Sequence, residues 1–213
     1  MASIELRFPL LRWLKKAIRK WQEKNRLKRL ALKYRGKLRI IIGAAATKQE
    51  GWISTDYPLL DLTDARSFAS LFGSGSVSSF LAEHVWEHLS PEDGAKACSN
   101  CFVYLKHGGS LRIAVPDGFH PDTEYISQVR PGGYGPGADD HKVLYNYRSL
   151  AAMLEKAGYK VKLLEWFDEQ AVFHKENWDV SDGLIMRSTR FDQRNKVNQT
   201  AYTSLIIDAT KPE

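Results

Sequence analysis

The chain has 213 residues, of which 43% are hydrophobic and 26% are charged, and its formal net charge is +6. These values exclude a disordered or fibrous chain and allow one substantial core. No apolar run approaches the roughly 20 residues of a membrane-spanning helix. The two cysteines, Cys98 and Cys101, are too few for a disulfide scaffold or a structural zinc site, so we expect reduced thiols in a cytoplasmic protein.

The positive charge is concentrated at the N-terminus. Residues 1–37 contain 13 Lys or Arg and two Glu, a net charge of +11, whereas the remaining chain has 18 basic and 23 acidic residues, a net charge of −5. We therefore predict two parts, a basic segment 1–37 and a globular domain 38–213. A mildly acidic domain argues against nucleic acid as a partner.

Residues 8–34 predict an amphipathic helix, because apolar residues recur at three- and four-residue steps with Lys and Arg between them. In one interpretation the helix packs its apolar stripe on the domain. In the other it lies on the inner face of a membrane, with Trp13 and Trp21 at the interface and the basic residues facing anionic lipid. A nucleic-acid or protein partner is a third alternative.

The stretch from Leu38 to Asp56 predicts two strands and a ligand-binding turn. Leu38–Ile42 is a β-branched run typical of a strand buried on both faces, and it stops at Gly43 before three alanines. Such a turn lets a ligand approach the backbone closely. The next run, Trp52–Thr55, ends in Asp56, the position from which an acidic residue accepts hydrogen bonds from ribose hydroxyls.

Further along, Tyr57–Leu62 is a candidate third strand, and Val77–Ala82 is a buried strand that ends at Glu83. The sequence EHVWEHL follows from Glu83 and matches the H-x-x-E-H pattern of zinc hydrolases. In that hypothesis His84 and His88 share a metal from one helix, Glu87 polarises a water, and a downstream glutamate is the third ligand. The candidates for that glutamate are Glu155 and Glu165.

The second half alternates helices and strands around a long irregular segment, Gly118–Asp140, of the kind that often forms a binding loop. His141 lies at the far end of this segment. Residues 168–200 carry no pattern that assigns them. The predicted elements are a helix from Ser90 to Lys106, a strand from Ser110 to Val115 closed by Asp117, a helix from Tyr147 to Lys156, and strands over Lys160–Trp166 and Ser204–Ala209.

This alternation predicts a parallel or mostly parallel sheet with right-handed crossovers, in which the ligand site lies at the carboxyl ends of the strands. Six candidate residues fall on that edge, together with the long loop. They are Gly43, Asp56, Asp61, Glu83, His84 and Asp117.

With these positions in view, the chain resembles the class I S-adenosylmethionine (SAM)-dependent methyltransferases, and most closely a small bacterial branch of predicted methyltransferases. The resemblance covers about residues 38–210 and implies a Rossmann-like, mostly parallel seven-stranded sheet with helices on both faces. Its motifs are Ile41–Gly43, Gly51–Asp56, Asp61–Leu62, Ser76–Val77, Glu83–Leu89, Leu105–Gly109, Leu111–Asp117, His141, Tyr145–Asn146 and Leu154–Tyr159.

The resemblance also implies where the cofactor would lie. Gly43 and Ala44 would lie under its methionine part, and Asp56 on the ribose hydroxyls. Asp61 and Leu62 would lie near the adenine, and Glu83 and His84 beside the sulfonium. One departure concerns Ala45, because such families usually carry a glycine where the backbone and the ligand approach most closely.

The sequence therefore predicts methyl transfer to a small-molecule or sugar-containing acceptor, on oxygen, with His141, Asp117 or His84 as the base and without a metal. The alternatives are a non-catalytic binding module of the same fold, whose cofactor loop is degenerate, and the zinc hydrolase built on His84, Glu87 and His88.

Overall fold

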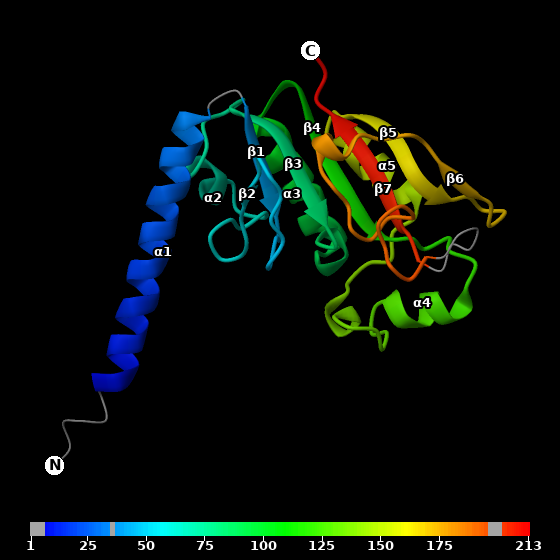
Figure 1. Ribbon diagram of the computed structural model, residues 1–213, viewed down its shortest axis with the longest axis horizontal. Helices are drawn as coiled ribbons and strands as arrows, with labels where there is room; N and C mark the ends of the chain where they lie inside the picture. The colour runs from blue at the N-terminus through cyan, green and yellow to red at the C-terminus, as the bar shows by residue number, and fades with distance from the viewer. Residues whose placement is uncertain (1–6, 35–36, 196–201) are drawn as a thin grey trace.

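The computed structural model describes residues 7–34, 37–195 and 202–213. Seven strands form one sheet in the order β2-β1-β3-β4-β7-β5-β6 (Figure 1). Strands β2, β1, β3 and β4 are mutually parallel, whereas β7 runs antiparallel between β4 and β5. The strands are β1 (Leu38–Ile42), β2 (Ile53–Ser54), β3 (Val77–Glu83), β4 (Leu105–Pro116), β5 (Lys160–Phe167), β6 (Phe173–Lys175) and β7 (Ser204–Thr210). The predicted Rossmann-like, mostly parallel sheet is confirmed.

Helix α1 precedes the sheet in the chain, and the other α-helices lie between β2 and β5. Helix α3 begins as predicted, because the Ser90 side chain accepts a hydrogen bond from the Asp93 N–H and Pro91 takes the first helical position. The α-helices are α1 (Arg7–Lys33), α2 (Ala65–Ala69), α3 (Pro91–Tyr104), α4 (Thr123–Val129) and α5 (Tyr147–Lys156). Three single turns of 3₁₀-helix are η1 (Trp86–His88), η2 (Ala138–Asp140) and η3 (Val180–Asp182).

The two faces of the sheet are covered differently. Buried side chains of α2, α3 and α5, such as Phe68, Cys98 and Leu154, pack on one face in the main core. On the other face a smaller cluster around Leu81 is covered by Ile185 and the neighbouring segment. Within the described residues, irregular chain with η3 thus takes the place that was predicted for helices on this second face.

The predicted strand Tyr57–Leu62 is wrong. The N–H groups of Leu59 and Leu60 both donate to the carbonyl oxygen of Asp56, so this stretch is a turn. Leu60 and Leu62 are buried in the main core, and their alternation with polar residues imitates a strand. Strand β4 also begins earlier than predicted, at Leu105, because α3 already ends at Tyr104.

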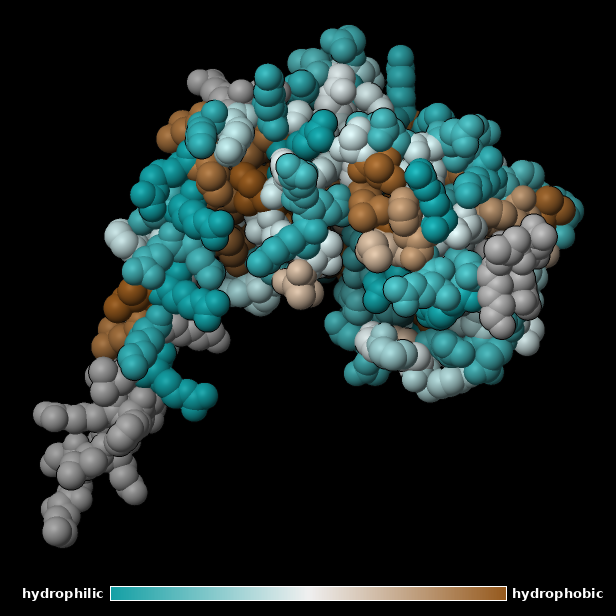
Figure 2. Space-filling view, viewed as in Figure 1, coloured by the Kyte–Doolittle hydropathy of each residue, from teal (hydrophilic) through white to brown (hydrophobic). Residues whose placement is uncertain are grey.

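Helix α1 is divided between a packed half and a projecting half. Leu27 and Ala31 are buried in the main core, whereas the N-terminal half extends away from the domain (Figure 1). Along that half, hydrophobic surface lies between hydrophilic side chains (Figure 2). The side chains predicted at positions 10, 11, 16 and 20 lie outside the described residues. In the part of the chain that the structure describes, no helix has both the length and the hydrophobicity to cross a bilayer.

Candidate functional site

Two adjoining pockets meet at the carboxyl edge of β1, β2 and β3, where the sequence predicts the ligand site. The smaller pocket has a volume of about 450 Å³ and lies over Gly43, Glu83 and His84. The larger pocket has a volume of about 860 Å³ and runs between α1 and β2, from Asp56 at the carboxyl edge back to Leu38 at the start of β1. Ala44, Ala45 and Gln49 line both pockets, so a single elongated ligand could contact both across this loop.

The loop after β1 has a backbone that favours glycine at two positions. Gly43 has φ +59°, and a Cβ added there would lie 2.5 Å from Cγ2 of Val85. Ala45 has φ +45° although it carries a methyl group. The loop is therefore a tight turn in which an alanine takes a conformation that glycine adopts more easily.

Asp56 closes this loop from the end of β2. Its Oδ2 accepts a hydrogen bond from the Ala45 N–H at 3.0 Å, and its Oδ1 accepts one from the Tyr57 N–H at 2.8 Å. The carboxylate is exposed and lines the larger pocket. Because each carboxylate oxygen has two lone pairs, Asp56 can hold the loop and still accept hydrogen bonds from a ligand's hydroxyl groups.

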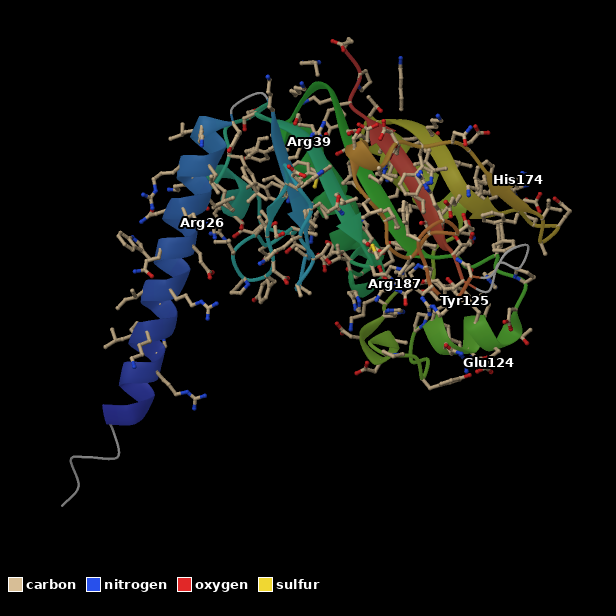
Figure 3. The ribbon with its side chains drawn as sticks, in the orientation of Figure 1. Arg26, Arg39, Glu124, Tyr125, His174 and Arg187 are labelled. Atoms are coloured by element: carbon tan, nitrogen blue, oxygen red, sulfur yellow. The ribbon has the colours of Figure 1, made fainter. Side chains whose placement is uncertain are left out.

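Glu83, at the end of β3, binds a distant part of the chain. Its two carboxylate oxygens accept hydrogen bonds from the backbone N–H groups of Arg187 (2.7 Å) and Met186 (3.2 Å). This brings Arg187 to the wall of the smaller pocket, at the edge of the sheet on the side of α4 (Figure 3). Arg187 was not predictable as a site residue, because residues 168–200 show neither periodicity nor a motif.

His84 is held on both sides of its ring. Nδ1 lies 2.9 Å from Oε1 of Glu87, and Nε2 lies 3.0 Å from Oγ of Ser204 on β7. Its backbone has φ +55°, which turns the chain out of β3 into η1. The zinc hydrolase hypothesis required His84 and His88 one turn apart on an α-helix, and this is wrong, because η1 is a single 3₁₀ turn that begins after His84.

The two glutamates proposed as a third zinc ligand are not near these imidazoles either. Oε2 of Glu165 accepts hydrogen bonds from the Thr189 N–H and the Thr203 hydroxyl, and its Oε1 accepts one from Nε1 of Trp178. Glu155 is an exposed residue of α5. The proposed hydrolase site is therefore not assembled.

His141 joins the smaller pocket from the far end of the long loop. The carbonyl oxygen of Glu87 accepts hydrogen bonds from the backbone N–H groups of Lys142 (2.6 Å) and Val143 (3.3 Å), which fastens this segment to η1. The His141 ring then meets the His88 ring edge-on, with centroids 4.8 Å apart. The structure thus brings His84 and His141, two of the three predicted catalytic residues, to the same pocket.

The third predicted catalytic residue, Asp117, does not line either pocket. It is fully buried, its Oδ1 accepts a hydrogen bond from the Phe119 N–H at 3.0 Å, and its Oδ2 accepts one from the Phe167 N–H at 2.8 Å. Burial raises the pKa of this carboxyl to about 6, against the opposing effect of the two N–H donors. These bonds tie the end of β4 to the end of β5.

Asp61 and Leu62, predicted near the adenine, also lie outside both pockets. Asp61 accepts hydrogen bonds from the backbone N–H and the hydroxyl of Thr63, and the Leu62 side chain is buried. Tyr57 and Leu59 line the larger pocket in their place. The turn at Asp56 explains why Tyr57 and Leu59 line the pocket instead of Asp61 and Leu62, since it directs the residues that follow Leu59 towards the core.

No protein-family model matches the chain, and no curated protein matches it. Several solved structures do match it. A SAM-dependent methyltransferase from Archaeoglobus fulgidus is 20% identical, with 90% of this chain and 94% of that chain covered and a TM-score of 0.48. A SAM-dependent methyltransferase from Thermotoga maritima, described as a possible histamine N-methyltransferase, is 14% identical, with 94% and 97% covered and a TM-score of 0.49.

An O-methyltransferase family protein from Burkholderia thailandensis is 10% identical, with 83% of this chain and 51% of that chain covered and a TM-score of 0.46. All three are described as methyltransferases, the class that the sequence motifs resemble. At these identities and TM-scores the likeness says nothing about what this chain does, so its activity has to be inferred from its own residues.

Proposed function

We propose that this protein is a SAM-dependent methyltransferase that acts on an oxygen atom of a small-molecule or sugar-containing acceptor. The observation that carries the proposal is the junction of the two pockets. There the loop of small residues after β1 and the exposed carboxylate of Asp56 adjoin a pocket lined by His84 and His141. A nucleoside-binding edge beside imidazole side chains suits transfer from a nucleoside cofactor.

The residues of the two pockets match the parts of SAM chemically. Asp56 would accept the ribose hydroxyls, and the exposed ring of Tyr57 offers a surface for the adenine. In the smaller pocket, the Glu83 carboxylate and the Arg187 guanidinium suit the ammonium and carboxylate of the methionine part, above Gly43 and Ala44. Asp61, Leu62 and Asp117 line neither pocket and have no part in this proposed site.

When bound, SAM supplies an electrophilic methyl group, so the protein has to align the acceptor, exclude water and take a proton. Nδ1 of His141 faces the carbonyl oxygen of Val129 at 2.6 Å. Since a carbonyl can only accept, Nδ1 carries the proton and Nε2 of the neutral ring is left as a base. His84, which is hydrogen-bonded to Ser204 and lies beside the Glu87 carboxylate, would position the acceptor or serve as the base instead.

Isothermal titration calorimetry with S-adenosylhomocysteine tests the cofactor assignment. Asp56→Ala should abolish binding, and Asp56→Asn, which keeps one carbonyl oxygen as an acceptor, should weaken it by roughly tenfold or more. Glu50→Ala is the matched control, because Glu50 is an exposed acidic residue between β1 and β2 that lines neither pocket. Full binding by Asp56→Ala would remove the ribose assignment.

One observation favours a second candidate function, a non-catalytic binding module of the same fold. The methyl group of Ala45 lies where the two pockets join, on a backbone with φ +45°. If that methyl group prevents the cofactor from reaching the backbone, the wild-type protein binds neither SAM nor S-adenosylhomocysteine, and Ala45→Gly binds both.

We further propose that α1 attaches the protein to the inner face of an anionic membrane, which would place it in the cytoplasm at a membrane surface. Trp13, Leu14, Ile18 and Trp21 are all exposed on the projecting half of the helix. At 100° per residue these four side chains share one side of the helix, and Arg12 and Lys15 lie on the opposite side. This distribution matches an interfacial helix.

A further inference from the structure

We infer that Glu87, His88 and His141 form a binding site for a first-row divalent metal ion such as Zn²⁺. One ligand atom from each residue lies within 4.8 Å of the others. In the described part of the chain, no other group of three His, Cys, Asp or Glu side chains comes this close together. All three residues line the smaller pocket, so a bound metal would have an open side facing it.

Both imidazoles are oriented as metal ligands are. Nδ1 of His141 donates to the Val129 carbonyl oxygen at 2.6 Å, and Nδ1 of His88 lies 3.4 Å from Oδ2 of Asp140. The Lys142 ammonium donates to Oδ1 of the same carboxylate at 2.8 Å, so Asp140 presents Oδ2 as an acceptor to the His88 ring. Each Nδ1 therefore carries the proton, and each Nε2 is left with the lone pair that binds a metal.

The Glu87 carboxylate is an independent sign of a missing partner. The residue is fully buried, and its Oε1 lies 2.9 Å from Nδ1 of His84. Both carboxylate oxygens are buried, and no described residue donates a hydrogen bond to either of them. A buried carboxylate oxygen without a partner is costly, and a cation is one of the few groups that offsets this cost.

Two imidazoles and one carboxylate are a ligand set suited to zinc and its first-row neighbours rather than to magnesium or calcium, which prefer oxygen ligands. Bonds of about 2.0–2.2 Å require ligand atoms roughly 3.5 Å apart. The three side chains thus have to close by about an ångström. His88 is half-exposed and can make that movement.

The role of such a metal rests on the proposed function, whereas metal binding does not. Next to the methyl donor, the ion would hold an oxygen atom of the acceptor, which favours acceptors with a hydroxyl or carboxylate group. His141 would then serve as a ligand, and the metal would take over the activation of the acceptor oxygen that the apo site assigns to His141.

The test uses the full chain without an affinity tag, freed of metal with a chelator and then dialysed against Zn²⁺ or Co²⁺. We expect one equivalent of bound zinc and, with Co²⁺, the visible absorption bands of a low-coordinate nitrogen and oxygen site. His88→Gln should remove both, as should His141→Gln. Asp140→Asn, which only frees the His88 ring, should weaken binding by roughly 10- to 100-fold.

His107→Gln is the control for a histidine outside the cluster, since its exposed ring contacts the Pro212 carbonyl oxygen. Circular dichroism shows whether each variant is folded. If the variant of the buried His141 does not fold, zinc binding by His88→Gln still tests the site. Less than stoichiometric zinc in the folded wild type, or zinc retained by folded His88→Gln, would overturn the inference. Parallel titration with S-adenosylhomocysteine separates the two proposals. A protein that binds zinc but not S-adenosylhomocysteine would support the metal site and contradict the methyltransferase proposal. A protein that binds S-adenosylhomocysteine but not zinc would support the methyltransferase proposal and contradict the metal site.

Discussion

Replacing Ala45 with glycine should stabilise the protein, which is the reverse of what glycine usually does. Ala45 has φ +45°, and a left-handed backbone costs an alanine roughly 1–2 kcal/mol more than a glycine. Glycine loses more chain entropy on folding, by roughly 0.5–1 kcal/mol. The difference predicts a gain in the free energy of unfolding of about 0.5–1 kcal/mol, equivalent to a rise in Tm of about 2 °C.

The neighbouring Ala46 provides a matched control, because it is also exposed but is not among the residues with positive φ. Ala46→Gly should lower the free energy of unfolding by roughly 0.5–1 kcal/mol, so the two variants should move in opposite directions in urea unfolding. Equal destabilisation by both would refute the left-handed conformation at Ala45. In the same samples, Ala45→Gly should bind S-adenosylhomocysteine more tightly than the wild type, because the backbone becomes accessible.

Two other regions give predictions that are independent of this loop. The raised pKa of Asp117, about 6 against 3.8 in the unfolded chain, means that the folded state holds this proton more tightly. The stability contributed by this group is complete below about pH 4 and is lost as the pH rises through about 6, a loss of about 3 kcal/mol. The fall in unfolding free energy between pH 4 and 7 should therefore be smaller in Asp117→Asn, and an equal fall would contradict the assignment. For α1, the double variant Trp13→Ala, Trp21→Ala should bind vesicles containing phosphatidylserine at least tenfold more weakly than the wild type. Tyr134→Ala, which removes an exposed aromatic ring elsewhere, should bind normally, and strong binding to neutral vesicles would speak against the charge argument.

The strands and the edge that carries the site were predictable from the sequence. Strands β1 and β3 are short apolar runs buried on both faces, and such runs show their ends in the sequence because a glycine or an acidic residue follows at once. The acidic residues at the ends of β2 and β3, Asp56 and Glu83, do line the two pockets. The two buried cysteines were also interpreted correctly as free thiols.

Which side chains face the pockets was not predictable, because single hydrogen bonds in irregular chain decide it. His141 is brought to the pocket by the hydrogen bond from the Lys142 N–H to the Glu87 carbonyl oxygen. Arg187 is brought there by the hydrogen bond from its own backbone N–H to the Glu83 carboxylate. Neither contact leaves a periodic pattern. Asp117 shows the converse, since its position at the end of β4 was predicted while its carboxylate turns to the Phe167 N–H instead of the pocket.

The most direct test of the account is calorimetric titration of the full chain with SAM and, separately, with S-adenosylhomocysteine. The account predicts saturable binding of both at one site per chain, abolished by Asp56→Ala and unaffected by Glu50→Ala. A folded wild-type protein that binds neither compound would contradict the methyltransferase proposal and favour the non-catalytic module.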